Sequence, residues 1–183
     1  MSQRLTLTND SPLRTILLDD HNIPQYKIST PLTLFRSTTT ITRCTTGKDE
    51  ELARIQWHTM RNSRILFQGQ ILDVGDFFKR KGRLSRDRKF NAPDGQEYEW
   101  VTQLRGMELI QTTHPKTAIA CFKEHTLNIF SSNHNAQLDI YPAGRHMVDL
   151  IITTFVYVEQ KRRERKESTT SSGSNASWSA GGC

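Results

Sequence analysis

Short stretches of alternating apolar and polar residues dominate the sequence between positions 13 and 141. The clearest is ARIQWH at 53–58, where alanine, isoleucine and tryptophan face one way and arginine, glutamine and histidine face the other. A period of two residues is typical of a β-strand with one buried face. In the stretch 98–104, the residues predicted to share one face are Tyr98, Trp100, Thr102 and Leu104. The other predicted strands are 13–18, 26–29, 38–43, 64–68, 71–73, 107–111, 117–123 and 137–141.

One segment, MVDLIITTFVYV at 147–158, departs from this pattern. Wound as a helix, it is apolar nearly all round, with only a thin polar stripe of Asp149, Thr153 and Gln160. Such a helix is buried on every side. The residue types also suit one more strand, but the segment continues into EQKRRERK, which favours a helix. It is too short for the ~20 apolar residues of a membrane span. We therefore expect a buried hydrophobic helix from Gly144 to Arg165.

Strands first and an apolar helix last predict a mainly β fold. Because no helical stretch separates the strands, a parallel α/β sheet is excluded. A single helix buried on all sides requires a sheet that wraps it, and closure removes exposed strand edges. The predicted fold is a closed antiparallel β-barrel of about ten to twelve strands around the C-terminal helix. The predicted organisation is a flexible N-terminus at 1–10, the barrel domain at 11–166, and a disordered tail at 167–183 that is rich in Ser, Thr and Gly.

Several of these segments together resemble a known family. They are YKISTP at 26–31, the strand 38–43, ARIQWH, PDG at 93–95 with Tyr98 and Trp100, and above all HMVDLIITTFVYVEQKRRER at 146–165. They resemble a domain-of-unknown-function family of mushroom-forming (basidiomycete) fungi. That family is similar in fold to the superfamily of tubby C-terminal, phospholipid scramblase and LURP-one-related domains.

The resemblance implies a twelve-stranded barrel threaded by a hydrophobic helix, which agrees with the prediction made from the residues. It implies little about activity, because fold alone does not supply a function. Members of the superfamily include a phosphoinositide-binding domain and a proposed lipid scramblase. No motif in this sequence matches their ligand-binding segments, so no site residue is transferred from them.

The charge of the chain is concentrated in one segment. The sequence has 25 basic and 19 acidic residues, a net charge of +6. The segment KRKGRLSRDRK at 79–89 contains seven of those bases and one acid, so the remainder is balanced at about 18 of each. Such a cluster is typical of a site for anionic lipid or another anion. The candidate anion-binding residues are Lys79, Arg80, Lys81, Arg83, Arg86, Arg88 and Lys89.

Three interpretations of this segment are open. It is a loop that meets an anionic membrane surface or a phosphoinositide, a nucleic-acid site, or a solvated loop that discourages edge pairing. Nucleic acid is the least favoured of the three, because no aromatic residues are interleaved for base stacking. We expect a binding module that is cytoplasmic and peripheral at membranes, with a nuclear location still open. The alternative is a protein-protein interaction scaffold with no lipid role. The sequence defines no oligomeric state.

Signatures of catalysis are missing from the sequence. It has no GxGxxG, Walker loop, GxSxG elbow or HExxH motif, so we expect a protein that is not an enzyme and uses no cofactor. Its six histidines and three cysteines lack ligand spacing, and no metal site is predicted. His146 and Asp149 would share a helix face. We expect backbone N–H groups of the first helical turn to satisfy Asp149.

Overall fold

The computed structural model describes residues 1–31, 37–58, 62–79, 87–113, 115–125 and 135–173. In these residues, twelve antiparallel strands form one sheet in the order β7-β6-β5-β4-β3-β2-β1-β12-β11-β10-β9-β8. The strands are β1 (Gln3–Leu7), β2 (Thr15–Leu18), β3 (Pro24–Ser29), β4 (Thr38–Arg43), β5 (Glu50–Gln56), β6 (Arg64–Phe67), β7 (Gln70–Asp73), β8 (Arg88–Asn91), β9 (Glu97–Gln103), β10 (Gly106–Gln111), β11 (Thr117–Lys123) and β12 (Gln137–Ile140). The helices are α1 (Val74–Phe77), the 3-10 helix η1 (Pro142–Met147) and α2 (Val148–Gly173).

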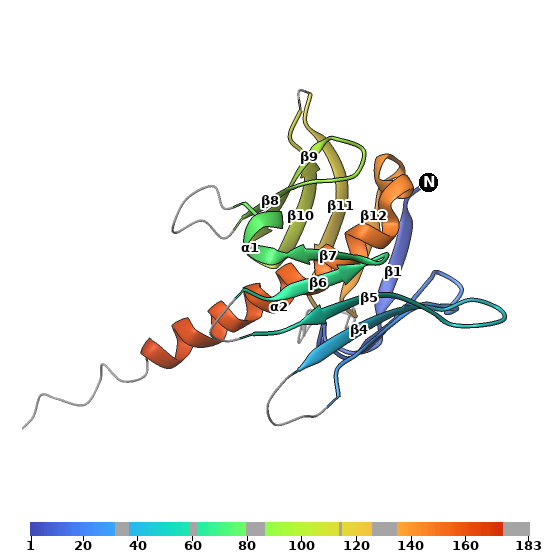
Figure 1. The fold of residues 1–183 in the computed structure, drawn as a ribbon, viewed down its shortest axis with the longest axis horizontal. Helices are drawn as coiled ribbons and strands as arrows, with labels where there is room; N and C mark the ends of the chain where they lie inside the picture. Colours follow the sequence, from blue (N-terminus) through green and yellow to red (C-terminus); the bar gives the residue numbers. More distant parts are fainter. Residues whose placement is uncertain (32–36, 59–61, 80–86, 114, 126–134, 174–183) are drawn as a thin grey trace, which may run out of the picture.

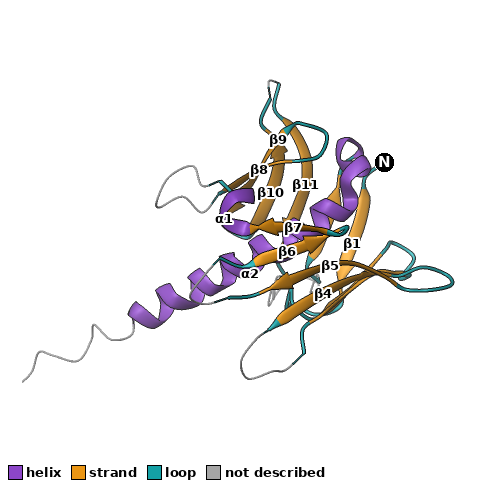
Figure 2. Ribbon diagram, viewed as in Figure 1, coloured by secondary structure: helices purple, strands orange, loops and turns teal. Residues whose placement is uncertain are grey.

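The sheet curves around α2, which runs through its interior and leaves it at one end (Figures 1 and 2). Every residue from Leu150 to Glu159 is buried, as expected for a helix that is apolar all round. Trp100 of β9 is fully buried, and its indole N–H donates to the hydroxyl of Thr154, 3.1 Å away inside the core. The prediction of a hydrophobic helix enclosed by a mainly β fold is therefore confirmed.

The first residues of the chain form a central strand, so the prediction of a flexible segment at 1–10 is wrong. Strand β1 pairs with β2 on one side and with β12 on the other. Leu5 and Leu7 point into the core and are almost completely buried, while Arg4 and Thr6 alternate with them. The alternation in RLTLT is the same period-two signal that predicted the other strands.

The two ends of the strand order, β7 and β8, meet at a seam. No ladder joins these two strands within the described residues. The prediction of a closed barrel is therefore corrected: the sheet wraps the helix but stays open between β7 and β8. The physical reason is that the chain turns into α1 directly after β7. Asp73 caps this turn by accepting from the backbone N–H of Gly75 at 3.0 Å.

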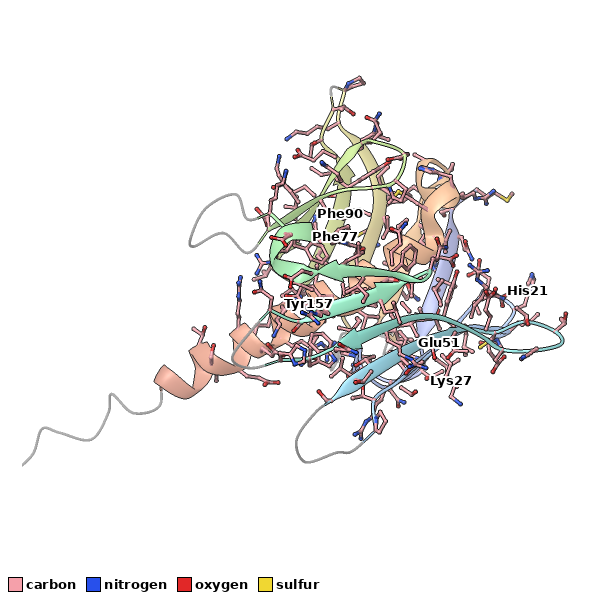
Figure 3. All side chains as sticks on the ribbon, in the orientation of Figure 1. His21, Lys27, Glu51, Phe77, Phe90 and Tyr157 are labelled. Atoms are coloured by element: carbon pink, nitrogen blue, oxygen red, sulfur yellow. The ribbon has the colours of Figure 1, made fainter. Side chains whose placement is uncertain are left out.

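Apart from one isolated backbone bridge, between Lys79 and Lys89, aromatic side chains fill the described part of the seam. Phe77 stacks on Phe90 of β8 with ring centroids 5.3 Å apart, and Phe78 stacks on Tyr157 of α2 at 5.1 Å. Tyr157 in turn stacks on Trp57, which follows β5, at 5.6 Å. Figure 3 shows Phe77, Phe90 and Tyr157 gathered where α1 faces the helix. Side-chain packing thus connects the two edges of the sheet through α2.

Helix α2 is longer than predicted, because it continues past Arg165 to Gly173. Its first half is enclosed by the sheet, and from Glu164 to Thr170 it is largely exposed. The predicted disordered tail therefore overlaps the last turns of the helix. Residues 174–183 of that tail lie outside the described residues.

Candidate functional site

A cavity of about 350 Å³ lies where α2 leaves the sheet. One wall is the helix, and the other is formed by the start of β8 and the turn between β9 and β10. We call this cavity the exit pocket. Its lining residues are Arg88, Thr102, Gln103, Leu104, Val158, Lys161, Arg162, Arg165, Lys166, Thr169 and Thr170.

The helical wall of the exit pocket follows directly from the sequence KRRERKESTT. Residues three and four apart lie on one face of an α-helix. Lys161, Arg165 and Thr169 are spaced by four, and so are Arg162, Lys166 and Thr170. These two adjacent rows place four cations and two hydroxyl groups along one stripe of α2. Four of the five cations of this run therefore line the exit pocket, and the fifth, Arg163, lies outside it.

The charge of its lining separates the exit pocket from two other cavities of similar size. Five of its lining residues are Lys or Arg, and none of the described lining residues is a carboxylate. By contrast, a neighbouring cavity of about 370 Å³ has three carboxylates in its lining: Asp10, Glu124 and Glu167. Lys161, Arg162 and Lys166 pair with Glu164, Glu159 and Glu124, but these carboxylates lie outside that lining. The cavity itself therefore faces clustered cations, which give a partly enclosed space a positive potential. The exit pocket is therefore the candidate site for an anion.

Arg162 is, with Arg88, one of the two buried cations of the exit pocket, and it is held by carboxylates behind it. Its Nε lies 2.7 Å from Glu159, and its Nη2 contacts both Glu159 and Glu124. Burial alone would lower the pKa of Arg162, but the hydrogen bonds and charges of Glu159 and Glu124 raise it, so the guanidinium stays charged. Its Nη1 is buried and has no hydrogen-bond partner in the described part of the chain. A buried donor without an acceptor is costly to the fold.

Only one of the seven predicted anion-binding residues lines the exit pocket. Arg88 lies on the inner face of β8, as Phe90 does, and its side chain reaches the cavity. Lys89 faces outward and pairs with Glu97 at 2.8 Å, and this hydrogen bond raises the pKa of Lys89. Lys79 is exposed and forms a backbone bridge with Lys89. The other four, Arg80, Lys81, Arg83 and Arg86, lie outside the described residues.

The sequence prediction missed the residues of α2 and Leu104. Lys161, Arg165 and Lys166 belong to the basic run that follows the apolar segment. In the sequence analysis this run indicated a helix but no binding site. Their spacing by four was the signal that could have placed them on one face. Leu104 was predicted to share a strand face with Trp100, but it lies in the turn after β9 and is 90% exposed, whereas Trp100 is fully buried.

A third cavity, of about 460 Å³, lies at the opposite end of α2, where the helix enters the sheet. We call this region the entry end. Its charged groups have partners: His146 lies 3.1 Å from Asp94, which also accepts from the hydroxyl of Tyr98 at 2.6 Å. Asp149 accepts from the hydroxyl of Tyr26 at 2.8 Å and pairs with Arg43. The expectation that backbone N–H groups satisfy Asp149 is therefore replaced by two side-chain partners from β3 and β4.

Comparison with known proteins identifies the family. Residues 10–164 match a family of unknown function, DUF6593. The chain belongs to this family. The DUF6593 match covers the whole wrapped sheet except β1 and includes the buried part of α2 and its basic face as far as Glu164. No curated protein and no solved structure matches the chain.

Two further findings concern the described part of the chain. It contains no helix that is both long enough and apolar enough to cross a bilayer. It also contains no cluster of three or more His, Cys, Asp or Glu side chains arranged to hold a metal ion.

Proposed function

We propose that this protein is a non-enzymatic binding module that takes a phosphate-bearing anion, the headgroup of a membrane lipid such as a phosphoinositide, in the exit pocket. The observation that carries the proposal is the lining of that pocket: five cations, no carboxylate among its described residues, and one buried guanidinium nitrogen without an acceptor. Phosphate oxygens are the preferred acceptors of such a cluster, and arginine binds them with two parallel N–H groups.

The basic segment 79–89 supports the same proposal. Its residue Arg88 lies in the wall of the pocket, and four of its cations lie between 80 and 86 in the sequence. Near an anionic leaflet each such cation contributes about 1 kcal/mol. The resemblance to the tubby and phospholipid scramblase superfamily adds support, because the wrapped helix agrees with the fold that it implies and some of its members are associated with lipids.

The test is co-sedimentation with phosphatidylcholine vesicles, with and without phosphoinositide or phosphatidylserine, at low salt. Reversing two pocket charges, Lys161→Glu with Arg165→Glu, should weaken binding about tenfold or more. The matched control is Lys27→Glu with Lys48→Glu, which changes the net charge equally on exposed sites away from the exit of α2 (Figure 3 labels Lys27). This control should bind as the wild type does, apart from a small long-range effect that salt screens.

A second variant tests the loop by itself, with Arg80, Lys81 and Arg83 all changed to glutamate. We expect it to bind anionic vesicles more weakly while its thermal stability is unchanged. Absence of wild-type binding at low salt, or binding indifferent to both sets of reversals, contradicts the proposal. In that case, recovery of one stoichiometric protein partner that the same reversals abolish would support the scaffold alternative.

A further inference from the structure

The turn between β9 and β10 presents an apolar side chain to solvent. Leu104 and Arg105 are the two turn residues, and Leu104 is 90% exposed. Glycine, asparagine and aspartate are the usual residues of two-residue turns, because they adopt the required backbone conformations easily. A leucine at this tip is not explained by the turn. A single exposed leucine is nevertheless common on protein surfaces, so its exposure alone carries no conclusion.

The position of Leu104 makes it informative, because it lines the exit pocket beside the cations of α2. Ile23 and Ile71 are also strongly exposed, but neither lines any of the three cavities described above. An apolar tip next to a cation cluster matches a surface that is anionic outside and apolar just beneath. The interface of an anionic bilayer has this arrangement. A phosphate compound in solution has no apolar layer for the leucine to enter.

The tip is held in a fixed position relative to the pocket. Strands β9 and β10 pair over their whole length, from Gly106 opposite Gln103 to Gln111 opposite Tyr98. Gly106 has a φ of +147°, and a Cβ there would lie 2.0 Å from the carbonyl oxygen of Phe122. Only glycine fits this close approach to β11, so the turn is anchored to the sheet on both sides.

We infer that the turn residue Leu104 and the cations of the exit pocket form one membrane-contact face, with Leu104 entering the acyl boundary of an anionic bilayer while the pocket holds a lipid headgroup. This inference rests on the proposed function and adds the source of the anion: a lipid within a membrane and not a free phosphate. On this face the exposed half of α2 runs along the bilayer surface, with Lys161 and Arg165 next to the headgroups. The cations provide attraction that salt screens, and the leucine provides attraction that salt leaves unchanged.

The experiment compares the wild type with Leu104→Ser and with a control, Ile23→Ser. The control removes another exposed apolar side chain, 55% exposed against 90% for Leu104, next to His21 on the far side of the molecule (Figure 3 labels His21). Two measurements are made on each protein: calorimetric binding of soluble inositol trisphosphate, and co-sedimentation with phosphatidylcholine vesicles that contain phosphoinositide. Leu104→Ser should weaken vesicle binding about tenfold and should affect the binding of soluble inositol trisphosphate far less, because the leucine presents no polar group to the phosphates. Leu104→Phe should restore vesicle binding, and Ile23→Ser should match the wild type in both measurements.

The outcomes separate this inference from the proposed function. If Leu104→Ser binds vesicles as the wild type does, the inference is overturned while the proposed function stands. If Leu104→Ser loses affinity for inositol trisphosphate and vesicles equally, the leucine shapes the pocket and does not enter the membrane, which also overturns the inference. If the wild type binds neither, the proposed function fails and the inference fails with it.

Discussion

At the entry end of α2 the charged side chains are paired with one another, whereas at the exit end cations gather around a cavity whose described lining has no carboxylate. Asp149 and Asp94 each have two side-chain partners at the entry end. At the exit end Arg162 keeps a buried nitrogen without an acceptor. Lys161, Arg162 and Lys166 also have carboxylate partners, but those carboxylates lie outside the lining, so the exit pocket itself faces cations alone within the described residues. The comparison predicts that substitutions at the entry end affect stability and that those on the exit-pocket surface affect binding.

The largest effect is expected between the two ends, where the helix is fully enclosed. Ile151 is fully buried, and Ile151→Asp places an unpaired charge in the core, which should unfold the domain. Circular dichroism would then show no cooperative melting transition. The matched control, Ile151→Val, should melt cooperatively with a loss of about 1 kcal/mol. A normally melting Ile151→Asp variant would refute the enclosed helix.

The second effect concerns the carboxylate behind the exit pocket. Glu159 is fully buried and bonds to Arg162 and Arg163. Glu159→Gln leaves the Arg162 charge without its main partner and should reduce the free energy of unfolding by about 3 kcal/mol in urea denaturation. Glu164→Gln, an exposed site on the same helix, should change it by less than about 0.5 kcal/mol. Equal effects of the two variants would mean that the buried pair does not anchor the helix.

A smaller loss of stability is expected at the entry end. Asp149→Asn weakens the contacts to Tyr26 and Arg43, and should reduce the free energy of unfolding by about 1–2 kcal/mol. Vesicle binding should be unchanged, because Asp149 does not line the exit pocket. A loss of binding without a loss of stability would contradict the division between the two ends.

Acid should weaken the entry end through Asp94. Burial would raise the pKa of Asp94, but hydrogen bonds from the Tyr98 hydroxyl, the Gln96 N–H and His146 lower it below the ordinary value of 3.8. A carboxylate with a lowered pKa stabilises the fold fully above its unfolded pKa and loses this contribution as the pH falls through the folded pKa. Urea midpoints measured between pH 6 and pH 2, a range of about four units around that value, should fall more steeply for the wild type than for Asp94→Asn. Parallel curves would show that Asp94 makes no such contribution.

The smallest effect on stability is expected at the tip of the turn. Leu104→Ser removes an exposed side chain that makes no buried contact, so the free energy of unfolding should change by less than about 0.5 kcal/mol. A thermal melt of the variant used for the vesicle experiment checks this. A larger loss would place Leu104 among the stabilising residues and remove it from the binding face.

Much of the fold could be predicted because its signals are local. Alternation predicted most of the strands, and the uniformly apolar segment 147–158 predicted the enclosed helix. Strand β1 shows the same alternation and was missed only because it lies at the start of the chain. The open seam could not be predicted, because it depends on how α1, a helix of four residues with no periodic signal, packs its aromatic neighbours against Tyr157.

Less of the candidate site could be predicted, because the exit pocket is assembled from separate segments. Charge density along the sequence identified 79–89 but could not show that Arg88 faces inward while Lys89 pairs with Glu97. Arg88 and Arg165 are far apart in the sequence and meet only after the sheet has wrapped the helix. Leu104 was misplaced because the alternation of the strand was extended into the turn. In the turn the chain reverses, and alternate residues no longer lie on the same face.

The pairing of β1 with β12 has a consequence for how the chain folds. The first strand of the sheet, at 3–7, must find a partner at 137–140, and the segment that fills the interior follows later still. On a ribosome neither step can take place until nearly the whole domain has been made. Contacts between residues so distant in sequence are formed slowly. Until they form, the apolar stretch MVDLIITTFVYV is exposed to water, and it is the part of the nascent protein that we expect chaperones to bind and aggregation to start from.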